Sequence, residues 1–395
     1  MANALLTPNQ ITREALRVLH QKLNFIGAIN RQYDDSFAKD GAKIGSALRI
    51  RLPNQYTVRT GANLSAQDTT ENQVTLNVTT QKGVDTQFTS ADLTLSLDDF
   101  SQRIINPAMA VLAAAIEADA FSMALDVYNA VNNVGSAITF KNTLQARKIL
   151  NDNLAPMDGQ RSVILNTQDN VDLVDALKGL FQDSSEIKAQ YRDGVMGHTA
   201  GFEFSENTLL PSQTTGTALS ATTYTVNGAN QTGSAVTVAT GSTTFKKGDV
   251  VNLAGCNSVH PETKVSTGIL QQFVVTADYA GGGGNLAISP AIVTSGATQN
   301  VSGSPTNGGA VTKIGGASAI YKPSLAFHKD AFTFATADLV LPKGVDMASR
   351  AVMDGLSMRL VRQYDINYDR FPVRLDLLYG YQTIRPQLAC RILSN

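Results

Sequence analysis

Apolar and polar residues alternate with two different periods along this chain, and the period changes from region to region. Between residues 8 and 23 the apolar residues recur every three or four positions, which predicts an amphipathic helix. In 44–52 and 74–78 they alternate one by one with polar residues, so these segments predict two strands of a long hairpin joined by the polar stretch 53–73. Isolated two-stranded ribbons are marginal in water, so the hairpin is expected to need a partner surface.

A long spine helix is predicted after Pro107, a residue that suits the first turn of a helix. Its expected length is about 25 residues, or roughly 37 Å. A shorter helix is indicated just before it by Ser96, which is followed by Asp98 and Asp99. We interpret the apolar stripe of the spine helix as core packing rather than as a contact with a cofactor. The stripe consists of Met109, Leu112, Ile116, Ala120, Met123 and Val127.

Residues 138–210 alternate between the two periods, which predicts a helix at 144–154, a strand at 162–165 and a helix at 170–181. Further strands are predicted at 324–327, 332–336, 356–361, 373–377 and 388–393. The last three have no partner nearby in sequence except each other. They are therefore expected to form one sheet that packs against the spine helix and brings its acidic residues near the arginines of the C-terminal tail.

The segment 211–316 differs from everything around it. It contains 17 of the 31 glycines, and it lies in a stretch without arginine that extends from Arg192 to Arg350. Short alternating apolar runs within it end at Gly, Asn or Asp, the pattern of strands joined by tight turns. The sequence thus predicts an all-β module inserted into an α+β host.

Composition narrows the function classes. The 395 residues are 43% hydrophobic and 16% charged, with a formal net charge of −1, so neither a strongly basic nucleic-acid-binding surface nor an acidic one is expected. Two cysteines, Cys256 and Cys390, make a disulfide framework unexpected and a reducing compartment compatible. The N-terminus carries no secretion signal, and the strongest apolar stretch, 108–116, is too short to span a membrane. We expect a soluble protein made in the cytosol.

No residue pattern indicates catalysis. The four histidines are widely separated and lack metal-ligand spacing, and His260 is expected in a surface loop. The run Gly281–Gly284 is not followed by the residues of a phosphate loop, so a hairpin turn is favoured. Glu117 and Asp119 point to different sides of a helix. Four tyrosines could stack on nucleic-acid bases, although sheet packing is favoured: Tyr364, Tyr368, Tyr379 and Tyr381. We expect no enzyme, no cofactor and no metal site.

Three segments resemble those of a known family. The first is Phe88–Leu93, which leads into the spine at Asp98–Phe100; the second is Phe245–Gly255, with the pattern K-x-G-D-x-hydrophobic-x-hydrophobic-A-G; the third is Arg374–Gly380, followed by Arg385-Pro386. With the order of elements, they resemble the major capsid (coat) proteins of tailed double-stranded DNA bacteriophages. The type with an inserted β-barrel domain, as in the short-tailed Salmonella phage, is the most similar.

The resemblance implies an α+β coat protein fold with five parts. These are an N-terminal arm (1–45), an extended hairpin loop (46–90), a peripheral domain with the spine helix (91–135 and 355–395), an axial domain (136–210 and 317–354) and an inserted all-β, Greek-key-like barrel (211–316).

The resemblance also implies a function. Such a subunit assembles with copies of itself, as hexamers and pentamers, into an icosahedral procapsid that matures around packaged double-stranded DNA. Its implied partners are a scaffolding protein, a portal protein and DNA bound without sequence specificity, with no membrane. Its implied location is the virion capsid, after assembly in the cytoplasm of the bacterial host.

Two other classes stay open from the residues alone. One is a binding protein displayed on a virion or cell, whose β module recognises a carbohydrate or receptor; clustered exposed aromatic residues would favour it. The other is an enzyme of unrecognised type. For the coat protein, the candidate contacts between subunits are Arg49, Arg51 and Arg59, which would meet carboxylates of a neighbour. The alternative for each arginine is exposure to solvent on a strand face, without contact to a neighbouring subunit.

Overall fold

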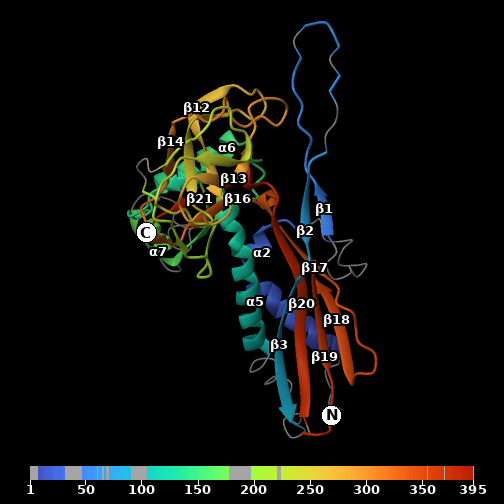
Figure 1. The fold of residues 1–395 in the computed structure, drawn as a ribbon. Coiled ribbons are helices and arrows are strands. Elements are labelled where there is room, and N and C mark those ends of the chain that lie inside the picture. Colours follow the sequence, from blue (N-terminus) through green and yellow to red (C-terminus); the bar gives the residue numbers. More distant parts are fainter. Residues whose placement is uncertain are drawn as a thin grey trace. The chain divides into compact units, whose positions relative to one another are not determined.

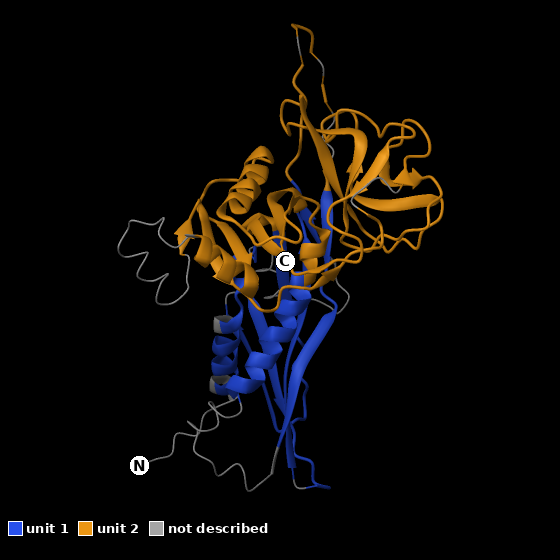
Figure 2. Cartoon of the chain, turned by 90° about the vertical axis from the view of Figure 1, so that its left-hand side faces the viewer, with its two compact units in different colours: residues 1–52, 73–121, 332–384 blue, residues 53–72, 122–331, 385–395 orange. Residues whose placement is uncertain are grey.

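The computed structural model describes residues 8–31, 47–59, 61–64, 66–67, 71–89, 105–177, 197–219, 224–353, 355–368 and 370–394. The chain forms two compact units, each assembled from separate segments (Figure 2). Unit 1 comprises residues 1–52, 73–121 and 332–384, and unit 2 comprises residues 53–72, 122–331 and 385–395.

Unit 1 is built on an antiparallel five-stranded sheet (Figure 1). The longest strand, β20, pairs with β3 along one side and with β19 and then β17 along the other, while β18 pairs with β19. The bounds are β3 Thr80–Thr89, β17 Phe332–Ala337, β18 Met347–Met353, β19 Leu356–Arg362 and β20 Arg370–Thr383. Strands β19 and β20 confirm the two alternating segments expected near the C-terminus.

Three helices pack with this sheet: α1 (Pro8–Lys22), α2 (Phe25–Ala28) and α5 (Asn106–Phe121). Helix α1, which confirms the first prediction, lies against β18, β19 and α5, and α5 lies against β3 and α2. Phe25 ties these elements together, because its ring stacks on Phe121 at 4.5 Å and meets Phe332 edge-on at 5.7 Å. All three rings are fully buried.

The spine is shorter than predicted. Its α-helix ends at Phe121 and continues as the 3₁₀-helix η4 (Ser122–Asp126). Steps of three residues in the apolar pattern suit either helix, so the pattern did not reveal the change. Within the described part of the chain, Asn106–Asp126 is long and apolar enough to cross a membrane, which corrects the shorter stretch expected above. Buried core helices meet the same test, and half of this segment's most apolar window is buried.

Charged residues of the C-terminal tail pair mainly within their own sheet. Arg359 and Asp376 form a two-pronged pair, with Nε–Oδ1 and Nη2–Oδ2 distances of 3.0 and 2.7 Å. Arg374 pairs with Asp85 of β3 at 3.0 Å. On the spine, Asp119 instead accepts from Lys82 at 2.7 Å. Asp98 and Asp99, also expected near the tail, lie outside the described residues.

Unit 2 contains a mixed six-stranded sheet in the order β4-β21-β16-β5-β7-β6. Its strands and neighbouring helices are β4 Ala130–Asn132, α6 Phe140–Asp152, β5 Arg161–Leu165, α7 Thr167–Leu177, β6 His198–Thr199, β7 Phe202–Glu206, β16 Ser324–His328 and β21 Ala389–Leu393. The predicted helices and strands of this region are therefore present, but α6, predicted at 144–154, begins four residues early, and α7 begins three residues early. Its first turn is held by Asn166 Oδ1, which accepts the Asp169 N–H at 2.7 Å. The expected end at residue 181 lies outside the described residues.

The expectation that the last three strands form one sheet is wrong. Strand β21 lies between β4, to which it is parallel, and β16, to which it is antiparallel. Every residue of β21 is buried. Alternation along a strand indicates which face is apolar, but it does not identify the neighbouring strand.

The remaining strands of unit 2 form an antiparallel sheet in the order β10-β13-β12-β11-β14-β9. Its edges meet, because Val226 beside β9 bridges Val238 of β10, and the six strands therefore close into a barrel. The bounds are β9 Tyr224–Thr225, β10 Gly233–Val238, β11 Val250–Val259, β12 Ser266–Val275, β13 Gly284–Ile292 and β14 Ala310–Lys313. A short pair, β8 (Gln213–Thr214) and β15 (Ile320–Tyr321), joins the two ends of the insertion.

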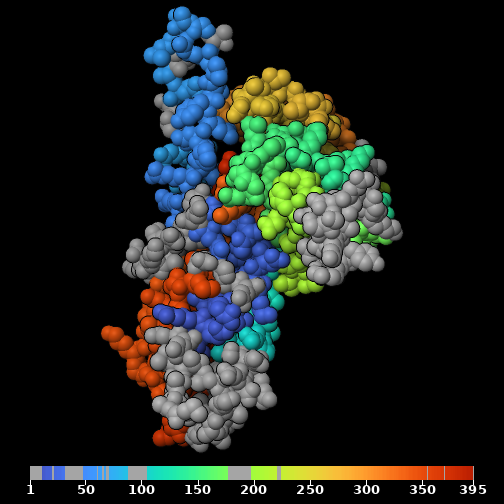
Figure 3. Space-filling view, turned by 180° about the vertical axis from the view of Figure 1, so that it is seen from behind, coloured from blue at the N-terminus to red at the C-terminus, as the bar shows by residue number. Residues whose placement is uncertain are grey.

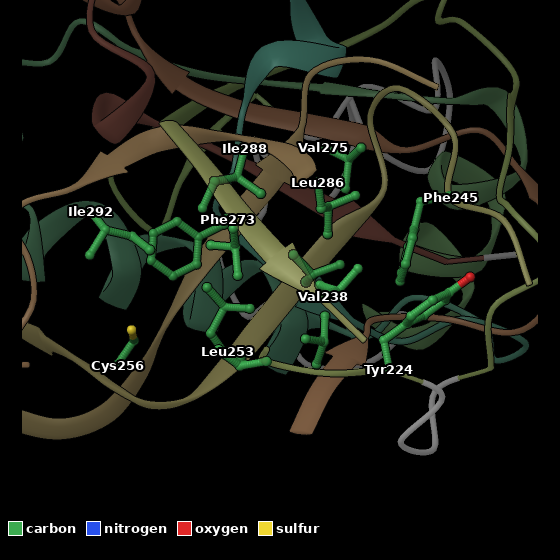
Figure 4. Close-up of a cluster of buried hydrophobic side chains, with 14 of the residues drawn as sticks. Tyr224, Val238, Phe245, Leu253, Cys256, Phe273, Val275, Leu286, Ile288 and Ile292 are labelled. Carbon is green, nitrogen blue, oxygen red and sulfur yellow. The ribbon is translucent and has the colours of Figure 1, made fainter. Parts of the chain in front are cut away.

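The barrel has its own apolar core, made only from residues between 218 and 311 (Figure 4). Phe273, Leu253 and Val238 are fully buried in it, and Tyr224 packs beside Phe245 with ring centres 5.5 Å apart. A core supplied by one continuous segment is what the alternating pattern of the insertion predicted.

Candidate assembly surfaces

The predicted hairpin places two of the three candidate arginines on one exposed face. Strands β1 (Ala47–Arg51) and β2 (Gln73–Asn77) pair antiparallel, with Arg49 opposite Thr75 and Arg51 opposite Gln73. Both arginines are exposed. Because side chains alternate across a strand, Ile50 points to the other face.

That other face finds its partner surface inside unit 1. Ile50 and Leu76 are 3% and 0% exposed. They pack in a cluster with Val78, Ala335, Ala337, Leu339, Leu378 and Ile384. The base of the hairpin therefore belongs to the core of unit 1, and only residues 53–72 remain as a surface feature.

The connection 53–72, called here the hairpin loop, is bridged by hydrogen bonds between Thr57 and Gln67. The Thr57 N–H and hydroxyl both donate to Gln67 Oε1, at 2.9 and 3.0 Å, and Gln67 Nε2 donates back to the Thr57 carbonyl at 2.5 Å. Arg59, the third candidate, is exposed and donates through Nη1 to the Gly61 carbonyl. In the space-filling view the described residues of the loop belong to a narrow column of blue atoms (Figure 3).

Apolar side chains on the hairpin loop are strongly exposed. Val58 is 95% exposed, Leu64 88% and Tyr56 57%. Apolar groups gathered on one ordered surface element are typical of a protein contact. The sequence prediction named only arginines here and missed these three residues, although apolar residues within an otherwise polar stretch were the available signal.

The turn between β19 and β20 is a second exposed apolar feature, in unit 1. Tyr364, Ile366 and Tyr368 are 41%, 80% and 71% exposed. Arg370 holds the turn, since it pairs with Asp365 at 3.0 Å and lies 4.4 Å from the centre of the Tyr368 ring. Exposed tyrosine beside arginine is characteristic of the energetic centres of protein interfaces.

The other two tyrosines considered for nucleic-acid stacking pack in the sheet instead. Tyr379 is fully buried, stacks on Phe334 at 5.5 Å and donates its hydroxyl to Asp119 Oδ2 at 2.5 Å. Burial and the Asp119 carboxylate raise the pKa of Tyr379 far above its usual value. Tyr381 is half-buried beside it.

The groups considered for catalysis have structural partners. Glu117 accepts the Phe25 N–H at 2.7 Å, while Asp119 serves Tyr379 and Lys82, so the two carboxylates act separately. His260 Nδ1 accepts two backbone N–H groups of its own loop. Among the described residues, no group of three His, Cys, Asp or Glu is arranged to hold a metal ion.

A family model described as "P22 coat protein - gene protein 5" matches residues 34–392 of the 395-residue chain. The chain belongs to the P22 coat protein family. It is a major capsid protein that forms an icosahedral shell, as the resemblance implied. The search of curated proteins gives no match.

Solved structures that align with this chain come from several phages. A structure of Mycobacterium phage Che8 aligns with a TM-score of 0.48 and 15% identity over 94% of this chain and 90% of that chain. The capsid structure of Cyanophage P-SCSP1u gives 0.43 and 11% over 90% and 84%. A satellite phage P4 procapsid with its size determination (Sid) protein gives 0.40 and 9% over 100% and 94%. These scores are low, and the family assignment rests on the family model.

In this coat protein, packing explains particular residues in two of the three segments that resemble the family. Asp249, from the pattern in the insertion, is fully buried, and its Oδ2 accepts the N–H groups of Lys246 and Gly216 at 2.9 and 3.0 Å. Near the C-terminus, a Cβ at Gly380 would collide with the backbone oxygen of Asn77, so only glycine fits. The segment from Ser90 to Phe100 lies outside the described residues.

The aromatic residues of the barrel do not form a recognition surface. Tyr224, Phe245 and Phe273 are each at most 1% exposed, and Tyr279 is half-buried against them. The interpretation of the module as a carbohydrate- or receptor-binding domain called for clustered exposed aromatics, and these four residues do not supply them.

Proposed function

We propose that this coat protein builds its shell through the hairpin loop, residues 53–72, which docks on a neighbouring subunit. The observation that supports this most is the near-complete exposure of Val58 and Leu64 on a loop stabilised by its own Thr57–Gln67 hydrogen bonds. A loop bridged by its own hydrogen bonds loses less conformational entropy on docking than an unbridged one, so burying its apolar side chains contributes directly to affinity. The turn at Tyr364–Tyr368 is the proposed second contact.

Weak individual contacts suit a closed shell. Errors are corrected during growth only if a misplaced subunit can leave, so each contact should be near millimolar, or about −4 kcal/mol, and be repeated many times. In this scheme Arg49, Arg51 and Arg59 meet carboxylates of the neighbour at the rim of the contact. Exposed ion pairs contribute little free energy, at most about 1 kcal/mol each, so these arginines set orientation more than affinity.

The same proposal covers the finer division of the chain and its partners. The parts are the arm (1–45), the extended hairpin (46–90), the peripheral domain (91–135, 355–395), the axial domain (136–210, 317–354) and the inserted barrel (211–316). In this proposal the barrel stabilises the subunit before assembly. Hexamers and pentamers form a procapsid with scaffolding and portal proteins in the bacterial cytoplasm. It matures around double-stranded DNA and remains as the virion capsid, with no catalytic step, cofactor or membrane. The net charge of −1 is compatible with contents held without tight adhesion.

Electron microscopy of the expressed protein, alone and with the neighbouring scaffolding and portal genes, tests this function. The expected result is closed shells of uniform size when scaffolding is present. Val58→Asp should prevent or deform shells because it places a charge in the contact, whereas the matched control Val58→Ile should assemble normally. Normal shells from Val58→Asp would remove the hairpin loop from the mechanism without affecting the family assignment.

A further inference from the structure

The last strand of the chain carries more buried polar groups than a sheet strand requires. In β21 and the residue after it, Arg391 and Ser394 are both 0% exposed. A buried polar group is costly unless it is hydrogen-bonded, and a buried charge is more costly still, so each of these side chains implies a structural task. Both tasks lie within unit 2.

Arg391 reaches the base of the inserted barrel. Its Nη1 donates to Gln213 Oε1 at 2.9 Å, in the short strand β8 where the insertion begins. The Asp249 carboxylate and the Tyr321 phenol interact with it electrostatically. Asp249 lies in the turn before β11, and Tyr321 is in β15, where the insertion returns to the host. One side chain of the final strand therefore serves both ends of the insertion.

A third buried charge belongs to the same group. Lys313 of β14 is 2% exposed, and its Nζ donates to the carbonyls of Gly216 and Gly316 at 2.8 and 2.7 Å. Burial raises the pKa of Asp249, while the charges of Lys313 and Arg391 act in the opposite direction and favour its carboxylate form. The barrel thus brings one buried negative charge and one positive charge, and the C-terminal strand adds the second positive charge.

Apolar contacts also join β21 to the base of the barrel. Leu393 of β21 packs in a buried cluster with Ala130, Val250, Ile314 and Tyr321. Val250 and Ile314 come from the base of the barrel, and Ala130 comes from host strand β4. The Gln272 side chain of β12 adds two hydrogen bonds to the backbone of Ala130, at 2.7 and 2.9 Å. Host sheet and barrel base therefore share one interior.

The end of β21 is held by a residue of the host, Asp169 in α7. The hydroxyls of Ser394 and Ser324 donate to the two oxygens of Asp169, at 2.6 and 2.5 Å, and this carboxylate is fully buried. Without Ser394, one Asp169 oxygen would lose its donor in the interior. Removal of β21 would also expose the pairing edges of β4 and β16.

We propose that strand β21 is a lock, which fixes the barrel base to the host sheet and is required for a subunit to enter the shell. The barrel core is independent of it, because that core is made only from residues between 218 and 311. The base layer and the host sheet instead become ordered together when residues 389–394 take their place between β4 and β16. A chain that lacks them keeps a folded barrel without a fixed attachment.

Hydrogen exchange on the full chain tests the coupling. Arg391→Met removes the charge and keeps much of the side-chain volume. We expect exchange in β14 and β16 to accelerate together by about 100-fold, equivalent to about 2.8 kcal/mol at 1.4 kcal/mol per tenfold. Strand β13, which is three places from β14 in either direction round the closed barrel, should keep its protection. The control Arg374→Met removes an exposed arginine, 57% accessible in its pair with Asp85, and should change none of these strands.

Faster exchange in β16 with β14 unchanged would overturn the coupling. If Arg391→Met gives no folded protein, Ser394→Ala supplies the same comparison from the host side.

Co-expression tests whether a chain without β21 enters the shell. A tagged chain ending at Leu388 is expressed with the untagged full-length protein, and a tagged full-length chain serves as control. The truncated chain should be depleted at least about tenfold from purified shells relative to its share of the soluble pool, a difference of about 1.4 kcal/mol. Entry in proportion to that share would overturn the lock.

Discussion

Removing the tip of the hairpin, Thr57 to Glu71, should separate assembly from folding. The apolar anchors of the hairpin, Ile50 and Leu76, lie outside the deleted segment and remain buried in unit 1. The three hydrogen bonds between Thr57 and Gln67 disappear together with both partners, so no buried group is left unpaired. The deletion therefore removes surface and leaves the core intact.

The expected change in the free energy of unfolding follows from the entropy of loop closure. The connection between β1 and β2 becomes roughly fourfold shorter, which is two halvings at about 0.6 kcal/mol each, or ~1.2 kcal/mol in favour of the folded state. Strain in the shorter turn opposes this gain. We expect the free energy of unfolding of the monomer to stay within about 1 kcal/mol of the parent value. By contrast, Leu76→Ala at the buried base should cost about 2 to 5 kcal/mol.

The assay combines denaturant unfolding of the monomer with electron microscopy of assembly reactions on the same preparation. The tipless protein should unfold like the parent and form no shells or deformed ones, while Leu76→Ala should lose stability first. Normal shells from the tipless protein would refute docking through the hairpin loop. A loss of several kcal/mol would instead show that the tip belongs to the folded core.

Three further outcomes are expected. Residues 211–316 expressed alone should fold as a monomer with slow exchange in the barrel core, and a spectrum without amide dispersion would contradict this. The free subunit should bind duplex DNA no better than in the roughly micromolar-to-millimolar non-specific range at physiological salt, so sub-micromolar binding with a steep salt slope would reopen a nucleic-acid role. Burial raises the pKa of Asp169 above its ordinary 3.8, so its contribution to stability is full below that pH and is lost as pH rises through the raised pKa. The stability of the parent relative to Asp169→Asn, measured by unfolding from about pH 4 to 7, should therefore fall with pH, and a constant difference would refute the assignment.

The sequence alone was enough for several of the elements and for the family. Periods of 3.6 and 2 residues identified α1, the hairpin strands β1 and β2, and the β-rich insertion, because each depends on neighbours close in the chain. The barrel core could be anticipated for the same reason, since one continuous segment supplies all of it. The coat protein assignment followed from the order of these parts together with short motifs, and the family model confirms it.

Only the tertiary structure decided which strands are neighbours and which charges are buried. Arg391 and Arg374 look alike in an alternating, arginine-rich tail, yet the first is fully buried below the barrel and the second is exposed beside Asp85. Val58 looks like an ordinary apolar residue, yet it is almost fully exposed. Burial depends on contacts between segments hundreds of residues apart, such as β4 with β21, and local periodicity carries no information about such partners.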